Sequence, residues 1–120
     1  MLVASRPFPK IFHGFFEFPG GKVQEKEYLI EALKRELFEE LSINIELSNT
    51  IFLYSYLIRR NSKKVHLNFF LSDKWNGSIK SMEKQIFKWV TIKNIGNCKI
   101  LSSNKKILKE LEYFSIFPRT

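Results

Sequence analysis

The chain has 120 residues and a mass of 14.3 kDa, which we interpret as one domain, residues 1–120, with a single hydrophobic core. Its 44% hydrophobic and 27% charged residues exclude a disordered chain, and its one cysteine, Cys98, excludes an internal disulfide and a cysteine-based zinc site. No apolar run is long enough for a membrane span or a signal peptide, so we expect a cytoplasmic protein with no membrane partner. The net charge of +8 is uneven, because residues 1–50 sum to −2 and residues 51–120 to +10, which indicates either an anionic partner or a solvated, lysine-rich face.

The first third of the chain predicts an extended segment, a tight turn and a helix. Residues 11–18 are rich in aromatic side chains and extended in character. They end at Pro19-Gly20-Gly21, where a proline followed by two glycines marks a turn that no side chain is allowed to crowd. Residues 28–41 then carry apolar side chains at helical spacing, which predicts an amphipathic helix with a buried stripe of leucine and isoleucine.

The middle of the chain predicts two strands joined by a hairpin. Residues 51–58 are apolar or aromatic apart from one serine, which is typical of a strand covered on both faces. Residues 65–71 place an apolar side chain at every second position, which predicts a strand with one inner face. The polar residues 61–64 between them are typical of a hairpin connection, and Asn76-Gly77 marks a further turn.

The last part of the chain predicts one more strand and a closing helix. Residues 86–92 have the composition of a strand. The final helix begins near Ser103, a suitable N-cap residue, and continues with apolar side chains at helical spacing. The order of strand, helix, three strands and helix predicts an α+β fold in which a mixed sheet lies between helices.

The predicted helix carries three carboxylates on one arc. Glu36, Glu39 and Glu40 are spaced i, i+3 and i+4, so their side chains leave the helix on neighbouring rows. Like charges at this spacing destabilise a helix by a few tenths of a kcal/mol per pair. A hard divalent cation with oxygen ligands, Mg²⁺ above all, would compensate for the repulsion. The alternative is a solvated acidic face with Lys34 and Arg35 as neighbours.

The segment from Gly21 to Ile43 resembles the Nudix box, G-x5-E-x7-R-E-U-x-E-E-x-G-U, in which U is a bulky aliphatic residue. The matching positions are Gly21, Glu27, Arg35, Glu36, Leu37, Glu39, Glu40 and Ile43. The constrained position that departs is Ser42, which stands where the family has a glycine that ends the helix in a left-handed turn. A residue other than glycine costs about 1 kcal/mol there. The chain is therefore similar to the Nudix hydrolases.

The resemblance extends beyond the box. Glu17-Phe18-Pro19-Gly20-Gly21-Lys22 is similar to the lead-in of the MutT-like subfamily, the 8-oxo-dGTP diphosphatases. This likeness implies a Nudix-like α/β/α sandwich with a mixed sheet. MutT-like chains have a first strand before the segment equivalent to Leu2–Arg6. We therefore expect either that the true start lies upstream or that the protein lacks that strand and part of one wall of the nucleotide pocket.

The resemblance also implies roles in catalysis. The residues that would hold one or more metal ions are Glu36, Glu39, Glu40 and the backbone carbonyl of Gly20. The ion is expected to be Mg²⁺, with Mn²⁺ as a substitute, and it would neutralise phosphate oxygens and lower the pKa of a bound water. Glu36 and Glu83 are the two candidates for the base that accepts the proton of that water. Arg35 would orient the glutamates through charge-assisted hydrogen bonds, and Glu27 would be a structural member of the group.

A second group of residues would bind the substrate. Its members are Arg6, Glu17, Phe18 and Asn104. In MutT-like enzymes an asparagine at the position of Asn104 pairs with donor and acceptor atoms of an oxidised guanine, while Phe18 would lie beside the purine and Arg6 would help to hold the nucleotide. Each has a structural alternative: Asn104 as a helix cap, Phe18 as a core residue and Arg6 as a surface charge.

The function implied is that of a Mg²⁺-dependent pyrophosphohydrolase that converts 8-oxo-dGTP to 8-oxo-dGMP and pyrophosphate and so limits replication errors. Two alternatives stay open. One is a Nudix hydrolase of another nucleotide, and the other is a truncated, non-catalytic protein of Nudix fold that binds nucleotide or RNA. We expect a monomer whose partner is a small-molecule nucleotide and which forms no stable nucleic-acid complex.

Overall fold

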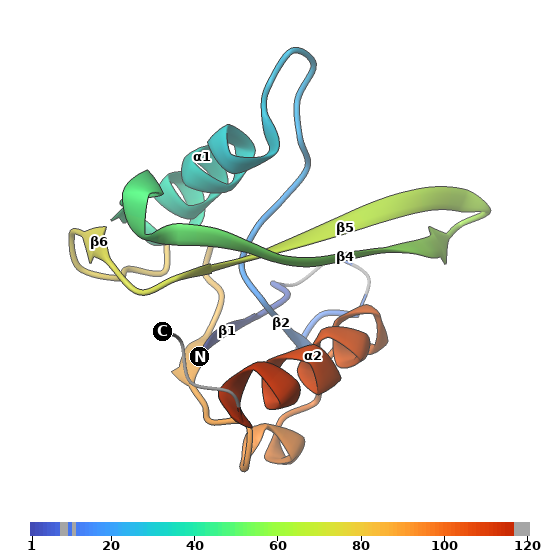
Figure 1. The fold of residues 1–120 in the computed structure, drawn as a ribbon. Coiled ribbons are helices and arrows are strands. Elements are labelled where there is room, and N and C mark those ends of the chain that lie inside the picture. The colour runs from blue at the N-terminus through green and yellow to red at the C-terminus, as the bar shows by residue number, and fades with distance from the viewer. Residues whose placement is uncertain (8–9, 11, 117–120) are drawn as a thin grey trace. The chain divides into compact units, whose positions relative to one another are not determined.

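The computed structural model describes residues 1–7, 10 and 12–116, apart from the side chains of residues 113–116. The chain forms two compact units, one made of residues 1–19 and 81–120 and the other of residues 20–80 (Figure 1). Each unit contains strands and one α-helix, so the predicted α+β fold is confirmed. Within the described residues, no helix is long and apolar enough to cross a membrane.

A three-stranded antiparallel sheet is the basis of the first unit. Its strands, in the spatial order β2-β1-β7, are β2 (Phe16–Glu17), β1 (Leu2–Ser5) and β7 (Phe87–Trp89). β1 is paired on both sides, which gives it the central place in this sheet. Phe16 also forms a parallel bridge with Ile100, so this unit combines antiparallel and parallel pairing.

The core of the first unit lies against this sheet. Its buried members are Val3, Phe16, Val90, Ile95 and Ile100. Short 3-10 turns at Ile95–Asn97 and Ser102–Asn104 lead into helix α2 (Lys105–Ile116). The predicted start of this helix near Ser103 is therefore confirmed to within two residues. Leu108 of α2 packs against the core cluster, as the helical spacing predicts for an inner face.

Two strands of the first unit are shorter than their sequences predict. The extended segment expected at residues 11–18 forms a strand only at Phe16–Glu17, because residues 12–14 turn, with φ of 59° at Phe12 and 85° at Gly14. Ile11 lies outside the described residues. The strand expected at residues 86–92 pairs only over Phe87–Trp89, which is the length over which β1 offers a partner.

Helix α1 (Leu29–Leu41) is the first element of the second unit, and it confirms the helix predicted at residues 28–41. The helix buries Ala32, Leu37 and Leu41, while Leu29, at its first position, is exposed. It ends at Ser42, whose φ of 60° and ψ of 31° put it in the left-handed region expected of the family's glycine. The N–H of Ser42 closes the last turn by donating to the carbonyl of Phe38.

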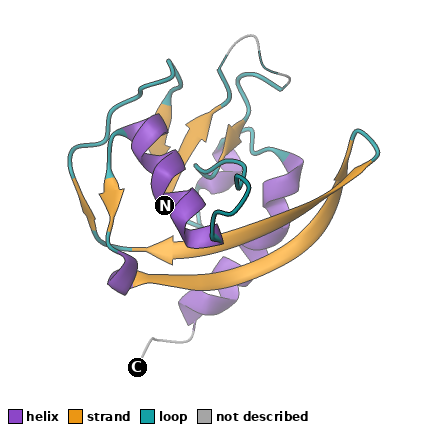
Figure 2. Ribbon diagram, turned by 90° about the horizontal axis from the view of Figure 1, so that it is seen from above, coloured by secondary structure: helices purple, strands orange, loops and turns teal. Residues whose placement is uncertain are grey.

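The second unit also contains two antiparallel strand pairs. β3 (Asn44–Ile45) pairs with β6 (Trp75–Asn76). β4 (Thr50–Arg60) and β5 (Lys63–Ser72) form a long curved hairpin that turns at Asn61 and Ser62, which both have positive φ (Figure 2). The predicted hairpin is thus confirmed, with a connection of two residues where the sequence indicated four.

The prediction that residues 51–58 are covered on both faces is wrong. Of this segment, Tyr56 is buried, but Ile51 is 41% exposed, Phe52 54% and Leu57 61%. The exposure of Phe52 and Leu57 shows that one face of the β4–β5 hairpin is open to solvent. In this segment a continuous run of apolar residues therefore does not indicate that both faces of the strand are buried.

Replacing Ser42 by glycine is expected to stabilise the protein. Glycine adopts φ of 60° without a Cβ clash, so Ser42→Gly should raise the free energy of unfolding by about 1 kcal/mol. Urea denaturation would show this as a higher midpoint with an unchanged slope. Ser42→Ala keeps the Cβ and is the matched control, for which no gain is expected. An equal gain in both variants would contradict the explanation.

Candidate active site

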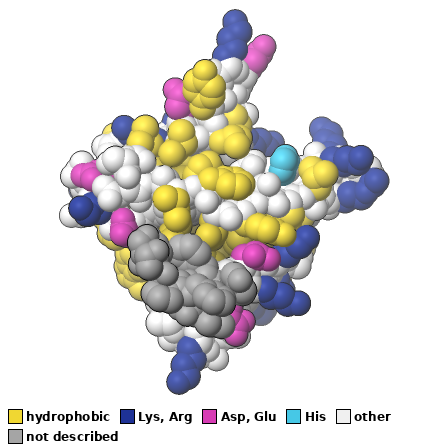
Figure 3. Space-filling model, viewed as in Figure 1, with side chains coloured by type: hydrophobic (Ala, Val, Ile, Leu, Met, Phe, Trp, Pro, Cys, Tyr) yellow, Lys and Arg dark blue, Asp and Glu magenta, His cyan; other side chains and the backbone are white. Residues whose placement is uncertain are grey.

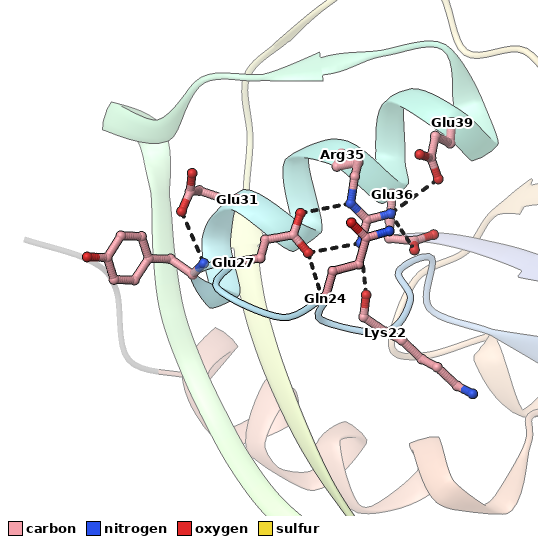
Figure 4. A network of polar contacts seen from close by, with 8 residues as sticks. Lys22, Gln24, Glu27, Glu31, Arg35, Glu36 and Glu39 are labelled. Atoms are coloured by element: carbon pink, nitrogen blue, oxygen red, sulfur yellow. Dashed lines mark hydrogen bonds and ion pairs between the residues drawn. The ribbon is translucent and has the colours of Figure 1, made fainter.

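Arg35 of helix α1 joins three glutamates (Figure 4). Its Nε and one terminal nitrogen donate to the two carboxylate oxygens of Glu27, at 2.8 and 3.0 Å. Its other terminal nitrogen donates to Glu36 at 2.9 Å and to Glu39 at 3.3 Å. One guanidinium, 23% exposed, thus compensates three carboxylates, and the contacts expected between Arg35 and the glutamates are present.

The loop before the helix is tied to the same arginine. Arg35 donates a further bond of 2.9 Å to the backbone carbonyl of Lys22. Glu27 in turn accepts a bond of 2.9 Å from the backbone N–H of Gln24. Because Glu27 lies before the first residue of α1, its two-pronged contact with Arg35 fastens residues 22–27 to the helix. This loop follows directly after Gly20 and Gly21.

The side chain of Glu36 explains why a glycine stands at position 21. A Cβ on Gly21 would overlap the carboxylate of Glu36, so no residue other than glycine fits there while Glu36 keeps its position. The carboxylate of Glu36 therefore lies between Arg35 and the backbone of the loop, and its side chain is only 18% exposed. The sequence indicated a turn that no side chain is allowed to crowd, and the group that fills the space is a predicted metal ligand.

The glutamates differ in how firmly they are held. Glu39 is 53% exposed and has the longer contact with Arg35, whereas Glu36 is largely covered. Glu40 is half-buried on the adjoining row of the helix. Among the described residues, no three His, Cys, Asp or Glu side chains converge closely enough to enclose a metal ion. The chemistry of the donor set nevertheless fits a hard divalent cation, because every side-chain donor is a carboxylate oxygen.

The Glu27–Arg35 pair shifts the titration of both groups. Hydrogen bonds from Arg35 and then from the N–H of Gln24 hold the pKa of Glu27 below its ordinary value of 4.5. The same contacts, with Glu27 first and Glu36 second, raise the pKa of Arg35 above its ordinary value. Arg35 therefore stays charged at any pH at which the protein works.

The remaining predicted residues lie in the other unit, where Asn104 contacts Phe18. Asn104 is 7% exposed, and its Oδ1 accepts a bond of 2.9 Å from the backbone N–H of Phe18. Its Nδ2 donates to Ser103 at 3.3 Å, a weaker contact. Phe18 packs against the core cluster of this unit. The amide of Asn104 thus has a structural partner and a fixed orientation.

Arg6 and Glu17 form an ion pair in this unit, with Nε and Oε2 at 3.3 Å. Arg6 directly follows β1, and Glu17 is the last residue of β2. The side chain of Arg6 is 16% exposed and that of Glu17 is 32% exposed. The backbone supports the pairing, because the N–H of Arg6 donates to the carbonyl of Phe15 at 2.9 Å. Arg6 and Glu17 were both expected at the substrate, and here each has a partner of opposite charge.

Glu83 lies on an exposed loop that is organised by Gln85, a residue that sequence reasoning missed. Gln85 is 7% exposed, and its Oε1 accepts bonds from Ser81 Oγ at 2.8 Å and from the backbone N–H of Glu83 at 2.9 Å. A buried glutamine among polar loop residues gives no signal in a single sequence. Gln85 holds the backbone of the loop, while the carboxylate of Glu83 extends from an exposed residue.

Replacing Glu27 by glutamine is expected to change how stability depends on pH. Because the pKa of Glu27 is lower in the folded than in the unfolded chain, its stabilising contribution is present above about pH 4.5 and is lost as the pH falls through the lower, folded-state pKa. Glu27→Gln should therefore be less stable than the parent near neutral pH, and the difference should shrink below about pH 4.

Urea denaturation at a series of pH values between about 3 and 7 would measure this difference. Glu25→Gln, which removes the same charge from an exposed position outside the network, is the control. A difference for Glu27→Gln that is the same at every pH would contradict the role given to the ion pair.

Comparison with known proteins places the chain in a family. A family model described as NUDIX domain matches residues 1–111. The chain is 37% identical over 102 residues to an 8-oxo-dGTP diphosphatase of Buchnera aphidicola subsp. Schizaphis graminum, covering 85% of this chain and 75% of the relative. It is 32% identical over 89 residues to the CTP pyrophosphohydrolase of Escherichia coli, covering 74% of this chain and 64% of the relative.

The three-dimensional structure is also similar to that of a known protein. A solved structure from work on MutT of Aliivibrio salmonicida and Vibrio cholerae matches with a TM-score of 0.78 and 28% sequence identity, covering 98% of this chain and 86% of that one. Nudix hydrolases generally use divalent metal ions, which agrees with the carboxylate donors of α1. The chain therefore belongs to the Nudix hydrolases, enzymes that act on phosphoanhydride bonds, and is similar among them to the MutT-like 8-oxo-dGTP diphosphatases.

Proposed function

We propose that the protein hydrolyses 8-oxo-dGTP to 8-oxo-dGMP and pyrophosphate with Mg²⁺, for which Mn²⁺ substitutes. The observation that carries the proposal is the network in which Arg35 holds the glutamates of α1 beside the Gly20-Gly21 loop. The curated relative from Buchnera, named an 8-oxo-dGTP diphosphatase, supports this choice of substrate. Removal of the oxidised nucleotide would limit replication errors, and we place the enzyme in the cytoplasm as a monomer.

In this proposal the carboxylates of α1 hold the metal. The ligands would be Glu36, Glu39, Glu40 and the carbonyl of Gly20. The bound ion would neutralise phosphate oxygens and lower the pKa of a water molecule, which is what hydrolysis of a polyanion requires. Arg35 keeps Glu36 and Glu39 in position, since it stays charged at every working pH. Glu36 and Glu83 both remain candidates for the base that accepts the proton of the water.

We further propose that the chain is a single domain and that the base of the nucleotide is recognised by residues of the first unit. Asn104 would read the oxidised guanine through its Nδ2, whose contact with Ser103 is long, while its Oδ1 stays on the N–H of Phe18. Phe18 would lie beside the purine, and Arg6 with Glu17 would help to hold the nucleotide. The fixed orientation of the buried amide supports this role, because recognition of a base edge requires a donor in a set place.

A second candidate is another nucleoside triphosphate, and a specific observation favours keeping it. One of the relatives above is named CTP pyrophosphohydrolase, and its identity to this chain, 32%, is close to that of the 8-oxo-dGTP diphosphatase, 37%. The glutamate network determines the chemistry at the phosphates and does not determine the base. The residues of the first unit therefore decide between the two substrates.

Hydrolysis of 8-oxo-dGTP, the four ordinary dNTPs and CTP in the presence of Mg²⁺ tests the proposal. We expect pyrophosphate release to favour 8-oxo-dGTP, and Glu40→Gln to lower it by about 100-fold or more, since the variant loses a metal ligand. Glu25→Gln removes an equal charge from an exposed position and should keep full activity. Preference for CTP would support the second candidate, and release that Glu40→Gln leaves unchanged would overturn the metal assignment.

Asn104 is tested by two substitutions. Asn104→Asp keeps the oxygen that accepts from Phe18 but removes the amide donor, whereas Asn104→Ala removes both. We expect each to reduce the preference for 8-oxo-dGTP over dGTP by about tenfold, the value of one or two hydrogen bonds. Measurement of kcat/KM for both substrates gives the preference, and the urea midpoint of each variant shows whether it is folded. A preference unchanged in folded Asn104→Asp would leave Asn104 with its structural role alone.

A further inference from the structure

The β4–β5 hairpin contains four cations and no acidic residue of its own. Between Glu46 and Asp73 the sequence has no Asp or Glu, and the cations of this span flank the hairpin turn at Arg59, Arg60, Lys63 and Lys64. In the strand register Arg59 lies directly opposite Lys64, and Arg60 directly opposite Lys63. Like charges in directly opposite positions destabilise a strand pair. The facing pair of Arg59 and Lys64 therefore has an energetic reason to take an anion.

One face of the hairpin connects this charge with exposed aromatic and polar side chains. This outer face is defined by four cross-strand pairs: Phe52 with Phe70, Ser55 with Asn68, Leu57 with His66, and Arg59 with Lys64. Phe52 is 54% exposed and contacts Phe70 edge to face, with ring centroids 5.6 Å apart. Leu57 is 61% exposed. Figure 3 shows Lys and Arg side chains gathered at the free end of the hairpin.

The opposite face of the hairpin has a different character. Tyr56 is buried there, and its ring stacks on that of Phe69 with centroids 5.4 Å apart. The aromatic side chains of this face contact one another, and Tyr56 is buried while Tyr54 and Phe69 are half-buried, so this face offers less aromatic surface to a partner. The open face is the one on which exposed Phe52 is followed by polar side chains and then by two cations.

This sequence of groups fits a single strand of nucleic acid. Single strands bind where bases stack on aromatic rings and phosphates meet Lys and Arg, while amide and hydroxyl groups contact base edges and sugars. From Phe52 to Arg59 the face extends about 24 Å at ~3.4 Å per residue, which is room for several nucleotides. A lipid surface fits less well, because Ser55, Asn68 and His66 interrupt the apolar side chains.

We propose that the outer face of the β4–β5 hairpin binds single-stranded nucleic acid, with phosphates at Arg59 and Lys64 and a base on Phe52. The site uses no residue of the proposed metal or nucleotide sites, so it stands or falls independently of the catalytic proposal. The binding is of the weak, salt-sensitive kind, which is consistent with the expectation that the protein forms no stable nucleic-acid complex.

Lys64→Glu tests the basic end of the face. The substitution replaces a like-charge pair by an opposite-charge pair with Arg59, so it should raise the urea midpoint while it weakens binding. With a fluorescent, 5′-unphosphorylated 12-nucleotide DNA or RNA strand, anisotropy should show at least about fivefold weaker binding and a salt slope smaller by about 0.7 per lost phosphate contact. Because the variant is expected to be more stable, a loss of binding is not explained by unfolding.

Lys105→Glu, an equal charge change at an exposed position of α2, is the matched control and should keep most of the affinity. Equal losses of affinity in the two variants would show that the effect comes from net charge alone, and this would overturn the proposal. An unchanged affinity in Lys64→Glu would overturn it as well. Glu40→Gln should bind the strand like the parent, which separates this site from the catalytic one.

Phe52→Ala tests the aromatic end. The loss of one stacked base should weaken single-strand binding at least about fivefold and leave the weaker binding to a duplex unchanged, since paired bases are not available for stacking. Equal effects on single strand and duplex would contradict stacking. Binding of the parent to vesicles of phosphatidylcholine and phosphatidylserine as tight as to the single strand, and equally sensitive to both substitutions, would assign the face to lipid instead.

Discussion

The arrangement of the second unit depends on the compensation of crowded carboxylates by one arginine. Helix α1 places Glu36, Glu39 and Glu40 on neighbouring rows, and the loop before it brings Glu27 to the same place. Without a cation these charges would repel one another and loosen both helix and loop. Arg35 compensates this repulsion by donating hydrogen bonds to three carboxylates and one carbonyl. A cluster of acidic side chains is thus held together by an arginine that also ties the loop to the helix.

Local periodicity was enough to predict the parts of the fold that depend on nearby residues. The helix at residues 28–41 and the β4–β5 hairpin were predictable, since spacing and turn residues act within a few positions. The lengths of β2 and β7 were not, because they depend on how far the distant strand β1 offers a partner. Coverage of β4 was also beyond the pattern, since an apolar run does not show whether a second layer lies against it.

The candidate site likewise contains residues that local spacing predicts and contacts that depend on distant parts of the chain. The glutamates and Arg35 were predictable because a motif with fixed spacing on one helix sets their positions. The partner of Asn104 was not, because the N–H of Phe18 comes from a segment 86 residues away in the chain. Gln85 was missed for a similar reason, since burial of a polar loop residue is decided by tertiary packing. The predictable residues are those proposed for the phosphate chemistry, and the unpredictable contacts surround the residues proposed to select the base.

The close approach of Gly21 to Glu36 has a consequence for any substitution at the glycine. The two positions share one volume, so a methyl group gained at the first has to push aside the carboxylate at the end of the second side chain. That displacement would take the carboxylate away from its present contact with Arg35, at 2.9 Å. A change at a position without a side chain would thus be felt in the contacts between Arg35 and the glutamates.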